Sequence, residues 1–101
     1  MDLSFLPLKI GQALNYLDLN GLYEIRLRAD FPIKINYKNK IYYLCENGIS
    51  NFKLNGIKIS KAEIAEIILN ITERSLYAHN DRLKEGFLTT KDGLRVGVAG
   101  E

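Results

Sequence analysis

The chain has 101 residues, of which 47% are hydrophobic and 26% are charged, a composition that excludes wholesale disorder. Fourteen Lys and Arg against twelve Asp and Glu leave a net charge of +2, too small by itself to indicate a nucleic-acid or membrane partner. The apolar runs are too short for a transmembrane helix or a signal peptide. One cysteine, Cys45, excludes an internal disulfide and indicates a reducing compartment. We therefore expect one cytoplasmic domain.

The first predicted element is an amphipathic helix close to the N-terminus. Apolar residues recur at helical spacing from Leu6 to Leu17. Pro7 fits the first turn, because its missing N–H has no intrahelical partner there. Asn20 and Gly21 both tolerate positive φ, so this pair is predicted to end the helix.

Apolar alternation then predicts a strand from Tyr23 to Arg28 and a hairpin after it. On the strand, Tyr23 and the two aliphatic residues that follow it at alternate positions are predicted to share one face. The hairpin is predicted from the apolar runs 33–37 and 41–44, which flank a turn at 38–40. Residues 46–59 are rich in Asn and Gly and predict a loop with one or two short strands.

Two helices and a second hairpin are predicted in the rest of the chain. Ser60 and Glu63 have the spacing of a capping box, and an isoleucine stripe follows them, which predicts a helix. A further helix is predicted over 75–85, and strands over 87–90 and 94–99 flank a Lys-Asp-Gly turn. The whole order predicts an α+β fold with a mainly antiparallel sheet of four to six strands and two to three helices.

Few residues of the chain suit catalysis or metal binding. One histidine and one cysteine cannot supply the four ligands of a His/Cys zinc site. Cys45 is predicted to be a buried thiol at a strand end and His79 a surface histidine, since no third group is seen to orient them as a nucleophile and base. The phosphate-binding pattern GxxxxGK[ST] is missing, and the GxxG at 97–100 is more typical of a bulge or close packing. No catalytic or metal residue is predicted.

The charged face of the first strand is the leading candidate site. Glu24, Arg26 and Arg28 alternate along the chain and are predicted to share one face. Arginine suits bidentate contact with a carboxylate of a partner domain or a phosphate of a nucleotide. The alternative is a surface ladder in which Glu24 pairs with an arginine across strands and contributes little stability. Arg95 is predicted to join this face if its strand is a neighbour.

The hairpin of residues 34–43 is a second candidate surface. Its lysines and tyrosines are close in sequence and could hold phosphates and stack on bases. Tyrosine is also common in strands, and lysine commonly protects sheet edges from aggregation. The hairpin therefore keeps open a stand-alone nucleic-acid-binding module as the alternative function.

Several segments together resemble the stage III sporulation protein AA family. They are EIRLR at 24–28 followed by Pro32, SLYA at 75–78, GFLT at 86–89 and GLRVGVAG at 93–100. The spacing between the segments also fits the family, so the resemblance covers nearly the whole chain. The chain departs from the family pattern where Leu94 replaces the usual His and where Asp92 replaces the first Gly of a common pair.

The resemblance implies that residues 1–101 form one N-terminal domain that precedes a P-loop ATPase core related to secretion-type ATPases. The full-length protein is then expected to use ATP and magnesium to energise a channel between mother cell and forespore, whereas this chain alone has no cofactor and no enzymatic activity. Its expected partners are its own ATPase domain, neighbouring subunits of a ring and other channel proteins, with no nucleic acid. The expected location is cytoplasmic and peripheral to the mother-cell membrane. Arg26, Arg28 and Arg95 are the candidates for contact with nucleotide or between domains.

Overall fold

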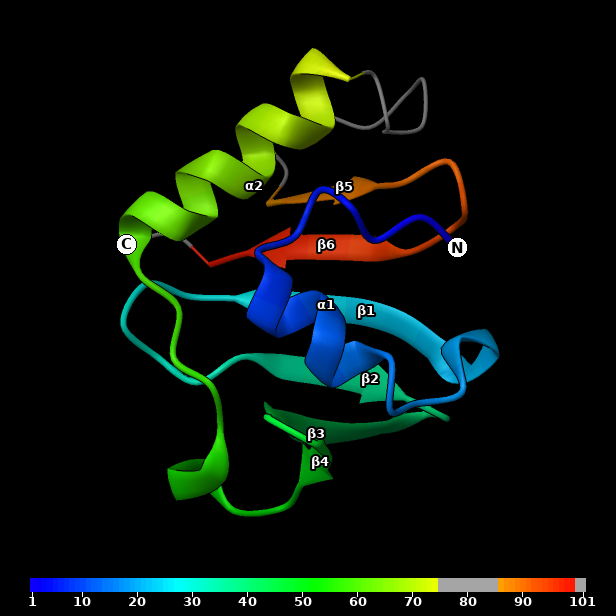
Figure 1. The fold of residues 1–101 in the computed structure, drawn as a ribbon, viewed down its shortest axis with the longest axis vertical. Helices are drawn as coiled ribbons and strands as arrows, with labels where there is room; N and C mark the ends of the chain where they lie inside the picture. The colour runs from blue at the N-terminus through cyan, green and yellow to red at the C-terminus, as the bar shows by residue number, and fades with distance from the viewer. Residues whose placement is uncertain (75–85, 100–101) are drawn as a thin grey trace.

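The computed structural model describes residues 1–74 and 86–99. In these ranges a six-stranded sheet is covered on one face by two α-helices (Figure 1). The fold is α+β, as predicted. The helices are α1 (Leu8–Leu14) and α2 (Lys61–Glu73), and two short 3-10 helices are η1 (Leu19–Gly21) and η2 (Lys53–Asn55). The strands are β1 (Leu22–Leu27), β2 (Lys34–Tyr37), β3 (Lys40–Cys45), β4 (Gly48–Ser50), β5 (Phe87–Thr89) and β6 (Arg95–Val98).

The strand order is β4-β3-β2-β1-β6-β5. All neighbouring pairs are antiparallel except β1 and β6, which are parallel. The predicted mainly antiparallel sheet is therefore confirmed, and both predicted hairpins are present. The parallel pair joins strands that are far apart in the sequence and places Arg95 directly opposite Glu24.

The helix near the N-terminus is shorter than predicted. It ends at Leu14, and the predicted stop at Asn20 and Gly21 instead lies in η1, where the Asp18 carboxylate accepts a hydrogen bond from the Asn20 N–H. The chain leaves the α-helical pattern through a tighter turn in which the Leu17 N–H donates to the Leu14 carbonyl. Leu17 thereby remains packed against the core although it lies beyond the helix.

The prediction for Tyr23 is wrong, because its side chain is half exposed instead of facing the core. The pairing of β1 with β2 shifts register between Leu22 and Glu24, so one extra residue is accommodated there. Leu22 takes the buried position, and from Ile25 onward the predicted alternation is restored. This bulge explains why simple period-two alternation misplaces Tyr23 but places the residues after it correctly.

The predicted capping box at the start of α2 is confirmed. The Glu63 N–H donates to Ser60 Oγ at 3.1 Å, and the Ser60 N–H donates to Glu63 Oε1 at 3.0 Å. The hydrogen bond from the Ser60 N–H, with the nearby Lys9 ammonium, lowers the pKa of the Glu63 carboxyl below its ordinary value of 4.5. Three isoleucines of α2 are buried, as the stripe predicted. The further helix predicted over 75–85 lies outside the described residues.

Contacts between the helices place them in one layer. Lys9 Nζ of α1 lies 3.3 Å from Glu63 Oε2 of α2, and Asn70 Nδ2 of α2 donates to the Phe5 carbonyl. Between this layer and the sheet lies the core, which includes Ile25 and Ile35 at zero exposure. The other face of the sheet is left uncovered by the described residues, and we call it the open face.

Candidate binding site on the open face of the sheet

Side chains of the open face form two rows across the strands, because residues opposite each other on paired strands point the same way. The first row crosses the groove described below, and the second row lies beside it. In order from β3 to β5, the first row is Tyr43, Lys34, Arg26, Gly97 and Phe87, and the second is Ile41, Asn36, Glu24, Arg95 and Thr89. Arg95 therefore shares a face with the charged residues of β1, as predicted for neighbouring strands.

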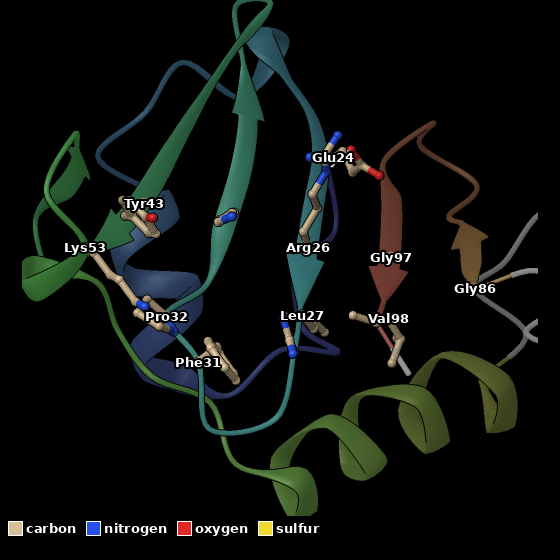
Figure 2. A pocket seen from close by; sticks show the side chains of 13 residues that line it. Glu24, Arg26, Leu27, Phe31, Pro32, Tyr43, Lys53, Gly86, Gly97 and Val98 are labelled. Atoms are coloured by element: carbon tan, nitrogen blue, oxygen red, sulfur yellow. Dashed lines mark hydrogen bonds and ion pairs between the residues drawn. The ribbon is translucent and has the colours of Figure 1, made fainter. Parts of the chain in front are cut away.

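A groove of about 540 Å³ is hollowed into this face (Figure 2). In the view of Figure 2, Tyr43 and Lys53 lie on one side and Gly97 and Val98 on the other, with α1 behind the sheet. Four cationic side chains line the groove, and Glu24 supplies the one carboxylate among the described lining residues. The cations are Arg26, Arg28, Lys34 and Lys53. The groove is therefore far more positive than the chain as a whole.

Aromatic rings hold most of these cations in place. The Arg28 guanidinium lies 4.2 Å from the centre of the Phe31 ring, and Lys53 Nζ lies 5.5 Å from the same ring centre. Lys34 Nζ lies 5.9 Å from the centre of the Tyr43 ring. Each distance is in the range of a cation–π interaction, which contributes about 0.5–1 kcal/mol at an exposed site and does not neutralise the charge.

Arg95 lies beyond the groove and has a ring of its own. Its guanidinium is 3.7 Å from the centre of the Phe87 ring on the neighbouring strand. Arg95 is not among the residues that line the groove, although its neighbour Glu24 is. The structure thus brings together Arg26 and Arg28 at the groove and places Arg95 next to it on the same face.

The carboxylate of Glu24 pairs within its own strand. Glu24 Oε1 accepts from Arg26 Nε at 2.8 Å, and half of the Arg26 side chain remains exposed. The cross-strand ladder considered from the sequence is therefore not the pairing that forms. Among the residues that the structure describes, no ion pair involves Arg28, Lys34 or Lys53, nor does one involve Arg95.

Two glycines shape the walls of the groove. A Cβ atom on Gly97 would lie 3.4 Å from Glu24 Oε2, at the near limit of ordinary contact with the carboxylate that Arg26 binds. A Cβ atom on Gly56 would lie 2.6 Å from Pro32 Cβ, which is closer than real Cβ contacts. The missing side chain at Gly56 lets η2, which carries Lys53, approach the segment that carries Phe31 and Pro32.

The other sequence candidates lie away from the groove. Cys45 is the last residue of β3, as predicted, but it is only half buried, and its thiol lies 3.5 Å from Asn47 Oδ1. His79 lies outside the described residues. Within 1–74 and 86–99, no three His, Cys, Asp or Glu side chains gather closely enough to hold a metal ion.

The tyrosines of the hairpin 34–43 do not form a platform for bases. Tyr37 is buried, its hydroxyl accepts from the Asp18 N–H, and its ring makes an edge contact with Tyr42 at 6.4 Å. Tyr43 alone of the three places its ring on the open face. The contacts of this hairpin therefore favour a structural role for Tyr37 and Tyr42.

Sequence reasoning missed Phe31 and Lys53, which complete the groove. Phe31 follows Asp30, a residue at φ 67°, and this left-handed turn directs the chain between β1 and β2 around the groove. Lys53 lies in the loop 46–59 with no periodicity to mark it. An arginine three positions before an aromatic residue, as Arg28 is before Phe31, can be noticed in the sequence. The approach of η2, which brings Lys53 to the groove, leaves no such pattern in the sequence.

The fold and the groove define a small α+β domain whose exposed chemistry consists of cations supported by aromatic rings. The family model for sporulation stage III, protein AA, matches residues 4–101, so the chain belongs to this family and has a sporulation-related role. The resemblance drawn from the sequence motifs is thereby confirmed. Comparison with curated proteins and with solved structures gave no match. Neither helix in the described ranges has the length and apolar character that crossing a membrane requires.

Proposed function

We propose that this chain is the non-catalytic N-terminal domain of a sporulation-associated, secretion-type ATPase that energises a channel between mother cell and forespore. Its task is to contact its own P-loop ATPase domain and neighbouring subunits, and it works in the cytoplasm at the mother-cell membrane beside other channel proteins. The observation that carries the proposal is the open face itself. Three groove cations and Arg95 are positioned by aromatic rings and have no carboxylate partner among the described residues.

Such a surface suits binding to another protein domain better than it suits catalysis of phosphoryl transfer. Phosphoryl transfer needs bound Mg²⁺ and a group that orients the attacking water, and both depend on carboxylate or hydroxyl side chains at the phosphates. The groove instead offers positive charge and ring surface, with Glu24 already paired to Arg26. We therefore assign ATP and magnesium to the ATPase domain of the full-length protein and no cofactor to this chain.

Nucleotide clamping is the narrower form of the proposal. Arg26 and Arg28 line the groove and Arg95 lies beside it on the neighbouring strand, so a phosphate presented by an adjacent ATPase domain could meet more than one of them. The partner supplies most of the nucleotide site in this arrangement. The chain alone should consequently bind nucleotide weakly and hydrolyse none.

The first experiment is to read the gene beyond the codon for Glu101. The proposal expects an open frame that encodes GxxxxGK[ST] at a strand-to-helix junction within about the next hundred residues. A stop codon directly after Glu101 would refute the ATPase assignment. ATP turnover by the purified chain that disappears in Arg26→Ala would refute its non-catalytic role.

The second experiment tests the face in the full-length protein. Arg28→Ala and Arg95→Ala should lower both the ATPase rate and the yield of heat-resistant spores, because each removes from the contact surface a cation that has no carboxylate partner within 1–74 and 86–99. Lys40→Ala is the matched control, since Lys40 is an exposed cation at the tip of the β2–β3 hairpin. Equal losses in all three variants would contradict a specific role for the open face.

The stand-alone nucleic-acid module remains the alternative to be tested, although no contact of the hairpin favours it. It requires salt-dependent oligonucleotide binding that Lys38→Ala and Tyr42→Ala both weaken. Since Tyr42 packs toward the core, a loss of binding in Tyr42→Ala would need a measured stability beside it.

A further inference from the structure

We infer that the groove binds an acidic segment of a partner protein chain, in extended form, through carboxylates that pair with Arg28, Lys34 and Lys53. This inference rests on the domain-contact form of the proposed function, for which it names the kind of partner, and it competes with the nucleotide-clamping form. It is argued only from the charges, rings and register of the open face.

The first step is that the cations are held in place before any partner arrives. Arg28 and Lys53 both lie against Phe31, and Lys34 lies against Tyr43. Side chains that are already positioned lose less conformational freedom on binding. A guanidinium stacked on a ring also keeps its N–H donors, which lie in its plane, free for a carboxylate.

The second step is that the rings are poorly placed to stack on bases. A nucleic-acid site of this kind needs exposed ring faces on which bases can lie. Phe31 has two cations within 5.5 Å of its ring centre, and Tyr43 has Lys34 near its own. The rings serve as supports for positive charge, so the groove favours an anion without a base.

The third step is that the groove fits carboxylates spaced along a chain better than one compact phosphate group. Among the described residues, no α-helix contributes to the lining, so no α-helix N-terminus offers the converging N–H groups of many phosphate sites. The cations come from separate elements, with Arg28 after β1, Lys34 on β2 and Lys53 on η2. Spaced cations of this kind match carboxylates spaced along a chain.

The fourth step is that a carboxylate already binds this surface. Glu24 Oε1 pairs with Arg26 at 2.8 Å on the open face, in the groove that Arg28, Lys34 and Lys53 also line. Acidic residues of a partner would continue this pattern at those three cations, which have no ion-pair partner in the part of the chain that the structure describes. Charge complementarity therefore favours a segment rich in Glu or Asp.

The fifth step sets the length of the segment. The part of the row that lines the groove, from Tyr43 to Gly97, crosses four strands that lie about 4.8 Å apart, so it is about 14 Å long. An extended chain advances about 3.3 Å per residue, so about four residues span this part of the row. Gly97 lies between Arg26 and Phe87 in this row and leaves space at the surface where a backbone can approach.

The test is binding of a fluorescein-labelled, seven-residue peptide of alternating Glu and Ser to the 101-residue chain, followed by fluorescence anisotropy. A peptide with Gln in place of every Glu is the probe control. We expect binding of the Glu peptide that weakens as salt rises, and at least tenfold weaker binding of the Gln peptide. Arg28→Ala and Lys53→Ala should each weaken binding about fivefold, and the double variant more than tenfold.

Two further variants separate charge at the groove from charge in general. Lys40→Ala removes an exposed cation outside the groove and should bind the Glu peptide as the wild type does. Phe31→Leu keeps every charge but removes the ring that positions Arg28 and Lys53, and it should weaken binding about threefold. Urea unfolding of each variant shows whether a weaker signal comes from loss of fold.

Three results would overturn the inference. The first is that the Gln peptide binds as tightly as the Glu peptide, and the second is that Lys40→Ala weakens binding as much as Arg28→Ala or Lys53→Ala. The third is that ATP or a single-stranded oligonucleotide displaces the Glu peptide at a lower concentration than unlabelled peptide does. The last would make the groove a phosphate site. A gene that stops after Glu101 refutes the ATPase assignment but leaves the peptide result standing, so the two failures are distinguishable.

Discussion

Replacing Gly56 by alanine tests whether the close approach of η2 to the β1–β2 loop builds the groove. The backbone at Gly56, with φ −72° and ψ 143°, suits any residue, so alanine brings no backbone strain. The new Cβ would lie 2.6 Å from Pro32 Cβ and 3.3 Å from the Lys53 carbonyl oxygen. Ordinary contact begins at 3.4 Å, so the two segments must separate by about 0.8 Å.

The magnitude follows from two opposing effects. Overpacking at a rigid contact costs about 1–3 kcal/mol, whereas Gly→Ala lowers the entropy of the unfolded chain and stabilises by about 0.4–1 kcal/mol. Pro32 cannot move freely, because it is bridged to Lys58. We therefore expect Gly56→Ala to be about 1–2 kcal/mol less stable than the wild type, which lowers the urea midpoint by about 1 M.

Gly11→Ala is the matched control in the same assay. Gly11 lies within α1, and beyond the helix's own backbone and the two adjacent residues no described atom would come within 4 Å of its new Cβ. Alanine should stabilise the helix by about 0.5–1 kcal/mol at this position. If Gly56→Ala unfolds at the wild-type urea concentration or above it, the groove wall is not closely packed and the reasoning fails.

Three further substitutions test contacts elsewhere in the fold. Glu63→Gln keeps an acceptor for the Ser60 N–H but removes the titrating carboxyl. Because folding lowers the pKa of Glu63, the wild type should be more stable than this variant by about 0.5 kcal/mol at pH 7. The difference in stability should disappear as the pH falls below 4.5. A gap that persists at pH 2.5 in urea titrations would refute the assignment. Asn36→Val should raise stability by about 1 kcal/mol, because Asn36 Oδ1 is buried without a partner among the described residues; a lower urea midpoint would show that the amide is bonded in solution. Thr90→Val should cost about 1–2 kcal/mol, since the buried Thr90 Oγ1 accepts from the Leu94 N–H at 3.2 Å; unchanged hydrogen exchange at that N–H would contradict this.

Some features of the candidate site could be predicted from sequence patterns, and others could not. Alternation predicted that Arg26 and Arg28 lie together, and both line the groove, although Arg28 follows the last residue of β1. The position of Arg95 required knowledge that β6 lies beside β1, a pairing of residues about 70 positions apart. Motif resemblance identified the family without deciding which residues meet in space.

Misplaced residues have a common physical cause. Tyr23 is exposed because β1 shifts its register against β2 between Leu22 and Glu24. Asn20 and Gly21 suit the end of a helix, as predicted, but in the structure they lie in η1, where the Asp18 side chain accepts a hydrogen bond from the Asn20 N–H. In each case a distant or competing contact overrides a local preference.

The sequence by itself determined the α+β class, the capping box at Ser60, the two hairpins and the charged face of β1. These features depend on residues within about four positions of each other, where helix and strand periods and turn preferences act. The tertiary structure alone decided that Phe31 supports both Arg28 and Lys53, because only tertiary packing brings η2 to the β1–β2 loop. The groove exists because segments far apart in the sequence pack together, and local patterns do not encode that packing.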